Sequence, residues 1–375
     1  MFGFSVLATP ASRGSGARLG RLVTPHGAVE TPAFVPVGTR GAVKGVTPRQ
    51  LRETGTQIML GNTYHLHVRP GADCVAQLGG LHRFSGWGGP MLTDSGGYQV
   101  FSLARINRVT DEGVAFQSHF DGSSMFLDAA TSITIQEQLG ADIIMAFDQC
   151  PPLPSPAEEV QKAVERTIRW AEECKRSHRR EDQWLFGIVQ GGLDAGLRAR
   201  CARRLIEMGF DGYAVGGLSV GETHEEMIRV LDRVTPLLPP DRPRYLMGVG
   251  TPRDIVESVK RGIDMFDCVL PTRNGRNAHV FTATGHLKLR NRQHRLADEP
   301  LEAGCDCYSC AHFSRAYLRH LFITDEMLGP TLASIHNLRF FQRFMVRIRE
   351  LIRRGMLETI TREFPVAAGD TPDQR

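Results

Sequence analysis

Short apolar segments alternate with longer amphipathic stretches along most of the chain. Eight segments have the length of strands, and several are continuous apolar runs, which is typical of strands buried on both faces. They cover residues 32–38, 58–64, 90–96, 141–150, 184–191, 212–218, 244–250 and 265–273.

The gaps between these segments in the second half of the chain carry helical periodicity. The predicted helices cover residues 155–180, 194–208, 223–237 and 252–262, and glycine follows several of them, as expected at a helix end. Eight strands that alternate with helices predict an α/β fold, a (β/α)8 TIM barrel that forms a single catalytic domain over residues 1–375. A doubly wound open sheet is the alternative. Residues 101–126 interrupt the pattern and predict a β-rich hairpin with its turn at Asp121-Gly122.

Polar residues gather where the predicted strands end. The third strand ends in Asp94-Ser95-Gly96-Gly97, the fourth in Asp148-Gln149-Cys150, and the fifth in Gln190-Gly191-Gly192. Gly216-Gly217-Leu218 ends the sixth, and Asp267 lies in the eighth. One such aspartate is usually structural, but barrel enzymes place their chemistry at the C-terminal ends of the strands. The set therefore predicts one converging site.

Carboxylates at a shared site suit chemistry on a sugar centre. One aspartate can attack an anomeric carbon and hold a covalent glycosyl intermediate, while a second protonates the leaving group. A third aspartate beside a glutamine offers acceptors and donors that match a purine edge. Tyr98 and Met247 either sandwich a planar ring or simply pack in the core. Neither a phosphate-binding Gly-x-x-x-x-Gly-Lys loop nor a dinucleotide-binding Gly-x-Gly-x-x-Gly motif after a strand is present.

Three cysteines within six residues predict a metal site. Cys305, Cys307 and Cys310 offer thiolates at a density that suits tetrahedral zinc, and His312, His320 and His336 are candidates for the fourth ligand. His336 lies near the start of a predicted amphipathic helix, residues 334–354, which it would dock onto the cysteines. Four protein ligands leave no open position, so the expected Zn2+ is structural and braces a subdomain inserted near the C-terminus at about residues 280–345.

Charge adds one clue about partners. The net charge is only +4, but residues 271–297 contain six Lys or Arg and no Asp or Glu. Such a segment is either a phosphate-binding surface or a solvated basic face. No apolar run reaches the length of a membrane span, and the N-terminus does not resemble a secretion signal, so we expect a cytoplasmic protein without disulfides.

Several long motifs carry a family resemblance. Residues 93–101, 140–152, 212–221 and 262–276 resemble bacterial tRNA-guanine transglycosylase, and so does the Cys-x-Cys-x-x-Cys cluster with a histidine after 25 intervening residues. The resemblance spans nearly the whole chain, from about residue 4 to residue 364.

The resemblance implies a reaction, a partner and residue roles. The family exchanges guanine at the wobble position of tRNAs with a U-G-U anticodon core for prequeuine, in queuosine biosynthesis. Asp267 then corresponds to the nucleophile and Asp94 to the general acid/base, and His336 becomes the preferred fourth zinc ligand. The other implied roles are base reading by Asp148, Gln190, Gly217 and Leu218, stacking by Tyr98 and Met247, room for the aminomethyl group beside Cys150, and tRNA contacts by Arg273 and Arg276.

The resemblance also implies a homodimer. Two other functions compete with base exchange: a non-catalytic tRNA-binding subunit of such an enzyme, and a zinc-braced barrel hydrolase of another glycoside. A degenerate subunit need not keep both Asp94 and Asp267, and this chain has both.

Overall fold

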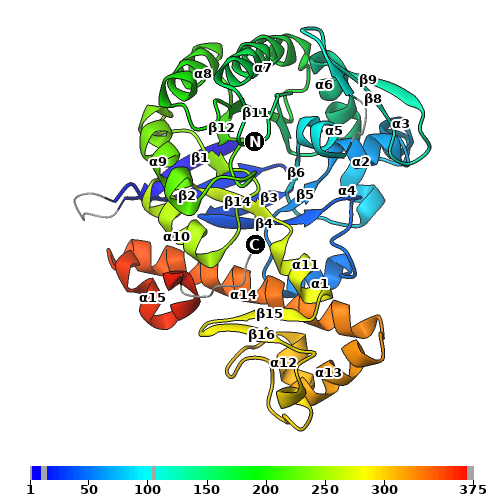
Figure 1. Cartoon of the computed structure of the whole chain (residues 1–375), viewed down its shortest axis with the longest axis vertical. Helices are drawn as coiled ribbons and strands as arrows, with labels where there is room; N and C mark the ends of the chain where they lie inside the picture. Colours follow the sequence, from blue (N-terminus) through cyan, green and yellow to red (C-terminus); the bar gives the residue numbers. More distant parts are fainter. Residues whose placement is uncertain (1, 10–14, 104–106, 370–375) are drawn as a thin grey trace.

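Eight parallel strands close into a barrel in the computed structural model, which describes residues 2–9, 15–103 and 107–369 (Figure 1). The strands neighbour one another in the order β10-β11-β12-β13-β14-β4-β5-β6. Their bounds are β4 (Ala33–Gly38), β5 (Met59–Gly61), β6 (Met91–Thr93), β10 (Ile143–Met145), β11 (Trp184–Val189), β12 (Gly212–Val215), β13 (Arg244–Leu246) and β14 (Met265–Cys268). The barrel prediction is confirmed, and the open sheet is excluded because β14 pairs with β4.

Successive side chains of each barrel strand point alternately into the barrel and out toward the helices, and both environments are apolar. One set of side chains fills the barrel interior and includes Val35, Leu60, Leu92, Met145, Ile188, Ala214 and Met265. Their sequence neighbours, including Phe34, Met59, Met91, Ile144, Val189, Val215 and Phe266, belong to the core outside the barrel. Both faces are therefore buried, as the composition of the runs predicts.

Helices surround the barrel. They are α1 (Pro48–Glu53), α2 (Thr63–Val68), α3 (Ala72–Gln77), α4 (Gly80–Ser85), α5 (Gly97–Leu103), α6 (Ala129–Leu139), α7 (Ala157–Ser177), α8 (Ala195–Met208), α9 (His224–Val234), α10 (Pro252–Lys260) and α11 (Leu270–Arg276). Side chains of Asp194, Thr223 and Thr251 accept hydrogen bonds from the first turns of α8, α9 and α10. Gly140 and Gly209 end α6 and α8 in the left-handed conformation, which glycine adopts without steric cost.

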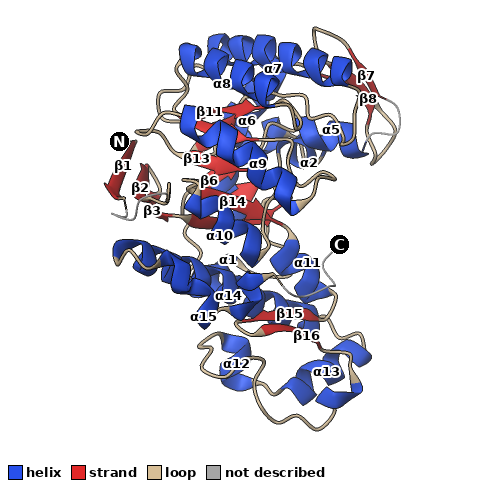
Figure 2. Cartoon of the chain, turned by 60° about the vertical axis from the view of Figure 1, so that its left-hand side comes forward, coloured by secondary structure: helices blue, strands red, loops and turns tan. Residues whose placement is uncertain are grey.

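A small antiparallel sheet closes the N-terminal end of the barrel. It consists of β1 (Gly3–Ala8), β2 (Leu19–Thr24) and β3 (Gly27–Thr31), which lie at the left of the barrel in Figure 2. Leu22 and Val29 of this sheet are buried and pack in the same cluster as the barrel interior. Because this end is plugged, the opposite end is the one left free for a site.

Most predicted strands end too late. The predicted strand 58–64 stops at Gly61, where Asn62 caps α2, and the predicted strand 265–273 stops at Cys268, before α11 begins. The predicted hairpin at 101–126 is wrong in extent, since α5 runs to Leu103 and a three-stranded sheet follows. Its strands are β7 (Asn107–Val109), β8 (Val114–Gln117) and β9 (Ser124–Leu127). The predicted turn at Asp121-Gly122 does join β8 to β9.

The C-terminal part packs beside the barrel through one long helix. Figure 1 shows α14 between the barrel and a smaller layer that contains β15, β16, α12 and α13. The bounds are β15 (His279–Thr282), β16 (Gly285–Lys288), α12 (Tyr308–His312), α13 (Arg315–Ile323), α14 (Leu328–Arg353) and α15 (Ile360–Glu363). Short 3-10 helices lie in this part at Arg292–His294, Leu357–Thr359 and Pro365–Ala368, and another lies after α9 at Thr235–Leu237. The predicted helix 334–354 therefore begins six residues too late. Among the described helices, none is long and apolar enough to cross a bilayer.

Candidate active site and metal centre

A cavity of about 970 Å³ lies at the C-terminal ends of the barrel strands. It is lined by Asp94, Tyr98, Asp148, Cys150, Gln190, Gly217, Leu218, Met247, Asp267 and Arg273, together with residues the sequence did not single out. Of the described residues predicted to act on or bind the substrate, only Arg276 lies outside its lining. The structure therefore brings the predicted strand-end residues into one site.

Asp94 follows β6 and is buried, with 7% of its surface exposed. Its Oδ1 accepts a hydrogen bond from the Thr63 amide (2.9 Å), and its Oδ2 accepts from Asn62 Nδ2 (2.5 Å) and Gln99 Nε2 (3.1 Å). Burial raises the pKa of Asp94 to about 7, and the charges of Asp267 and Asp148 add to this against the lowering effect of backbone donors. Near neutral pH this carboxyl can both give and take a proton.

Asp267 in β14 has a different environment. Tyr245 Oη donates to Asp267 Oδ1 at 2.5 Å, and the Gly248 amide donates to the same oxygen at 2.8 Å. Burial raises the pKa of Asp267, and these two donors counteract that rise by stabilising the charged form. Among the described residues both donors bind Oδ1, so the carboxylate is fixed in orientation while Oδ2 keeps its lone pairs.

Asp148 and Gln190 form a connected polar pair. Gln190 Nε2 donates to Asp148 Oδ2 (2.7 Å), and Ser95 Oγ donates to Oδ1 (2.8 Å). Burial raises the pKa of Asp148, and these donors partly offset the rise. Gly217 lies against this pair with φ +65°, and a Cβ there would lie 2.3 Å from Gln190 Oε1. Only glycine allows this approach, so backbone, amide and carboxylate share one wall.

The remaining predicted substrate residues differ in exposure. Cys150 and Leu218 are buried, and burial raises the pKa of the Cys150 thiol to about 12, so it stays protonated. Tyr98 is 50% exposed and lines the cavity, which excludes simple core packing for it. Met247 lines the same cavity while packing partly against the barrel interior.

The two predicted RNA contacts lie on α11 at the edge of the site. Arg273 is exposed and Arg276 is half-buried, and burial together with the charge of Arg273 lowers the pKa of Arg276. Neither guanidinium has an ion pair or hydrogen bond with another described residue. Both are thus available to an anionic ligand.

Three residues that position the site were missed from the sequence. Asn62 and Tyr245 donate to the two aspartates, and Arg198 is a fully buried cation behind Gln190. The burial of Arg198 could have been predicted from the sequence. It lies three, four and seven residues before Cys201, Ala202 and Leu205, so all four share one buried helical face. A charged side chain on such an apolar face must be paired with buried hydrogen-bond acceptors, because burying it without partners is costly.

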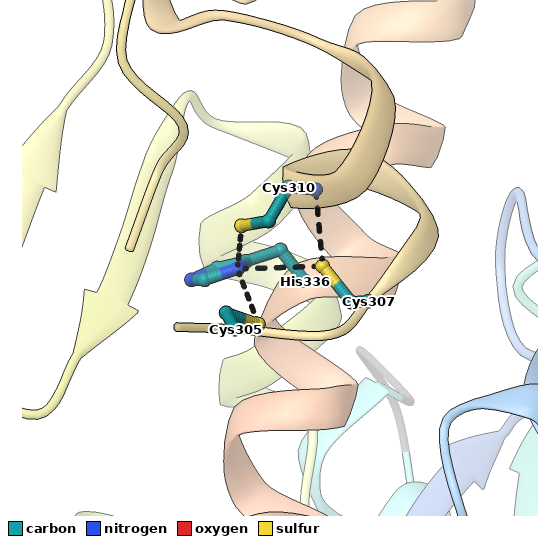
Figure 3. A group of neighbouring side chains, drawn as sticks. All are labelled: Cys305, Cys307, Cys310 and His336. Atoms are coloured by element: carbon teal, nitrogen blue, oxygen red, sulfur yellow. Dashed lines mark hydrogen bonds between the residues drawn. The ribbon is translucent and has the colours of Figure 1, made fainter. Parts of the chain in front are cut away.

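The metal-binding group lies in the C-terminal part of the chain, where α14 contributes His336 and the layer beside it contributes the three cysteines. His336 Nδ1 is 3.8 Å from Cys305 Sγ, 3.7 Å from Cys307 Sγ and 3.3 Å from Cys310 Sγ (Figure 3). About 3.6 Å separates nitrogen and sulfur ligands of a tetrahedral zinc with bonds of about 2.05 and 2.3 Å. His336 Nε2 donates to the Phe281 carbonyl at 2.7 Å, which leaves Nδ1 as the ligand atom. The buried group can therefore hold a metal ion, and His336 completes it.

A second group with potential ligands, His26, His82 and Asp142, lies at the other end of the barrel. Its two rings stack at a centroid distance of 3.6 Å and an interplanar angle of 12°, and each donates to one Asp142 oxygen. The in-plane lone pairs of parallel rings do not converge on one ion. We interpret this group as a hydrogen-bonded clamp.

The fold and the site define a TIM-barrel enzyme with a carboxylate site at the C-terminal ends of its strands. A family model described as queuine tRNA-ribosyltransferase matches residues 13–368. Curated proteins named queuine tRNA-ribosyltransferase are similar over nearly their whole length. Those of Desulforamulus reducens and Azotobacter vinelandii are 55% and 52% identical, covering 93% and 98% of this chain and 94% and 98% of their own. That of Pseudomonas aeruginosa is 52% identical over 98% of this chain and 97% of its own.

The chain therefore belongs to the queuine tRNA-ribosyltransferase family. The family resemblance inferred from the motifs is confirmed.

Proposed function

We propose that this chain is a tRNA-guanine transglycosylase that replaces guanine at the wobble position of U-G-U anticodon tRNAs with prequeuine, in queuosine biosynthesis. The observation that carries the proposal is the pair Asp94 and Asp267, two carboxyls in one cavity with contrasting hydrogen bonds. Membership of the family supports the same reaction.

Asp267 is the proposed nucleophile. Its free Oδ2 attacks C1′ of the wobble ribose, the C1′–N9 bond to guanine breaks, and a covalent ribosyl ester forms. Tyr245 and Gly248 support this role because their hydrogen bonds favour the ionised carboxylate and fix its orientation. The intermediate keeps the tRNA backbone intact while the bases exchange.

Asp94 is the proposed general acid and base. It gives its proton to the departing guanine, and it takes a proton from prequeuine when that base attacks C1′ and releases Asp267. A pKa of about 7 suits both transfers, since the acid and the base forms are both populated at neutral pH. One glycosidic bond is broken and one is formed, and Asp94 gives one proton and regains one, so the exchange needs no outside energy source.

The opposite wall is the proposed base-reading surface. Asp148 accepts hydrogen bonds from the N–H groups of the purine edge, and Gln190 with the backbone at Gly217 and Leu218 supplies the complementary groups. Tyr98 and Met247 enclose the flat ring. The small Cys150 beside Asp148 leaves room for the aminomethyl group of prequeuine.

The tRNA is held by its phosphates and loses one base from its stack. Arg273 and Arg276 are the proposed contacts of the anticodon loop, which fits two cations without protein partners among the described residues. Taking a base out of a single-stranded loop costs less than taking it out of a duplex.

The metal is proposed to be one structural Zn2+ on Cys305, Cys307, Cys310 and His336. It ties the cysteine segment 305–310 to α14 within the subdomain at about residues 280–345, and its four protein ligands leave no catalytic position. A homodimer and a cytoplasmic location are two further proposals, the first drawn from the resemblance and the second from the sequence.

The alternatives fit the site less well. A tRNA-binding subunit without activity has no need for donors that hold Asp267 and Asp94 in place. A glycoside hydrolase would not explain the paired Asp148 and Gln190 beside the Gly217 backbone.

Incorporation of labelled guanine into unmodified tRNA tests the proposal. We expect wild type to incorporate the label and Asp267→Asn to fall by about 10⁴-fold or more, because the nucleophile is lost. Circular dichroism and metal content should match between the two proteins. No incorporation by a folded wild type would refute the proposal.

A further inference from the structure

Arg198 of α8 places a guanidinium directly behind the proposed base-reading wall. The side chain is fully buried, with 0% of its surface exposed. Its Nη1 donates to the carbonyls of Val189 (2.8 Å) and Gly216 (2.6 Å), its Nε donates to Gly192 (2.9 Å), and its Nη2 donates to Gly217 (3.3 Å). One side chain thus binds four backbone carbonyls.

This cation has no acidic partner. Among the described residues, no carboxylate lies within ion-pair distance of Arg198, so the four carbonyls are the direct partners of its charge, and Glu222 favours the charged form only from a longer distance. Burial lowers the pKa of Arg198 to about 10, which still leaves it protonated at neutral pH. A buried charge without a counterion is costly, and a purely structural tie between two loops would not need one.

One carbonyl belongs to Val189, the last residue of β11, and the other three belong to two loops that both carry base-reading groups. Val189 directly precedes Gln190, Gly192 follows it in the loop after β11, and Gly216 and Gly217 follow β12. The contact is tight, since a Cβ at Gly191 would lie 2.7 Å from the Arg198 amide nitrogen. Only the planar fork of arginine presents donors to all four oxygens at once, whereas lysine offers a single point.

We propose that Arg198 is a positioning residue for base recognition, which fixes the Gln190 side chain and the Gly217–Leu218 backbone relative to Asp148. This inference rests on the proposed function, because it assigns Arg198 to the affinity for the exchanged purine. It predicts that Arg198 controls binding of the base and leaves binding of the tRNA backbone, which depends on other residues, unaffected.

The test compares Arg198→Lys with Arg200→Lys, a matched change on the same helix at an exposed arginine that pairs with Glu165. Equilibrium dialysis measures the Kd of labelled guanine, and filter binding at fixed salt measures the Kd of tRNA. Losing a buried hydrogen bond to a charged group typically weakens an equilibrium constant by about tenfold or more. We expect the guanine Kd of Arg198→Lys to rise by at least that factor, with the tRNA Kd within about twofold and Arg200→Lys unchanged.

Chemical rescue provides a second readout that a merely structural role would not move. Millimolar guanidinium should restore guanine binding to Arg198→Ala by occupying the vacated site, while sodium chloride at equal ionic strength should not. An unchanged guanine Kd in folded Arg198→Lys, or an equal loss of guanine and tRNA affinity, would overturn the inference. A wild type that binds no guanine would instead overturn the proposed function.

Discussion

The cavity and the metal-binding group handle buried polar atoms in opposite ways. In the metal-binding group every ligand atom points to one centre, and the second nitrogen of His336 is used by the Phe281 carbonyl. In the cavity Asp94 lies within electrostatic reach of both Asp148 and Asp267, and burial raises the pKa of all three carboxyls. Such an arrangement stores electrostatic strain, which is characteristic of functional sites. The proposed metal centre would brace the fold, whereas the proposed active site depends on the fold to hold carboxyls whose ionised form burial disfavours.

The largest effect is expected from removing a metal ligand, which should destabilise the fold. We expect Cys307→Ala to lose its zinc, lower the melting temperature by roughly 10 °C or more, and expose the chain to proteolysis between β16 and α13, because metal affinity there is folding free energy. Cys74→Ser is the control, since Cys74 lies outside the group. Metal analysis should find one zinc per wild-type chain. A stable, protease-resistant Cys307→Ala protein would show that the metal does not brace the fold.

The pH dependence should separate the two proton transfers of Asp94. Guanine release needs the protonated carboxyl, so its rate should fall as pH rises through about 7, the pKa of Asp94. Uptake of the incoming base needs the ionised carboxyl and should fall as pH drops through the same value. Single-turnover measurements of each half-reaction check this. Asp94→Asn should flatten both profiles and slow both steps by about 10²- to 10⁴-fold; parallel profiles for the two steps would contradict the assignment.

Tyr245→Phe tests the claim that its hydroxyl favours the ionised form of Asp267. Loss of the 2.5 Å hydrogen bond removes an effect that lowers the pKa of Asp267, so this pKa should rise further. We expect adduct formation to slow by about tenfold to a hundredfold at pH 6 and to recover partly at higher pH. Tyr213→Phe, in the neighbouring strand β12, is the control. A pH-independent loss in Tyr245→Phe would indicate a packing role instead.

The smallest effect is expected at the edge of the cavity. Arg273→Ala and Arg276→Ala should each weaken tRNA binding several-fold and reduce the salt slope of log K by about 1, because each removes one phosphate contact. Guanine affinity should not change. Arg229→Ala, an exposed arginine on α9, serves as the control, and an unaltered salt slope in the α11 variants would remove these residues from the tRNA surface.

The sequence predicted the barrel because the apolar period is a local property. Residues such as Phe34 and Val35 are both buried, on opposite faces of one strand, which is typical of parallel strands, while the pairing of β14 with β4 distinguishes the barrel from an open sheet. The ends of the strands were harder to predict. Asn62, for example, ends its strand because its side chain caps α2, and this hydrogen bond is visible only in the structure. The spacing of the cysteines predicted the metal site but left three histidines open. The family resemblance favoured His336, and the distances from its Nδ1 to the three sulfur atoms agree with that choice.

The site could be predicted in composition but not in arrangement. Asp94, Asp148 and Asp267 follow from their places at strand ends, since parallel strands bring those ends together. Tyr245 was out of reach because its side chain lies in the barrel-interior cluster while its hydroxyl serves Asp267, so it reads as an ordinary core residue. Which donor meets which oxygen depends on packing between strands far apart in sequence.

Trapping the covalent intermediate tests the central claim most directly. Wild-type protein, incubated with unmodified tRNA and quenched, should yield an RNA adduct whose peptide carries the ribose on Asp267. Asp267→Asn should give no adduct, and Asp94→Asn should give it slowly. An adduct located on Asp94 or Asp148, or base exchange at the wild-type rate by Asp267→Asn, would contradict the account.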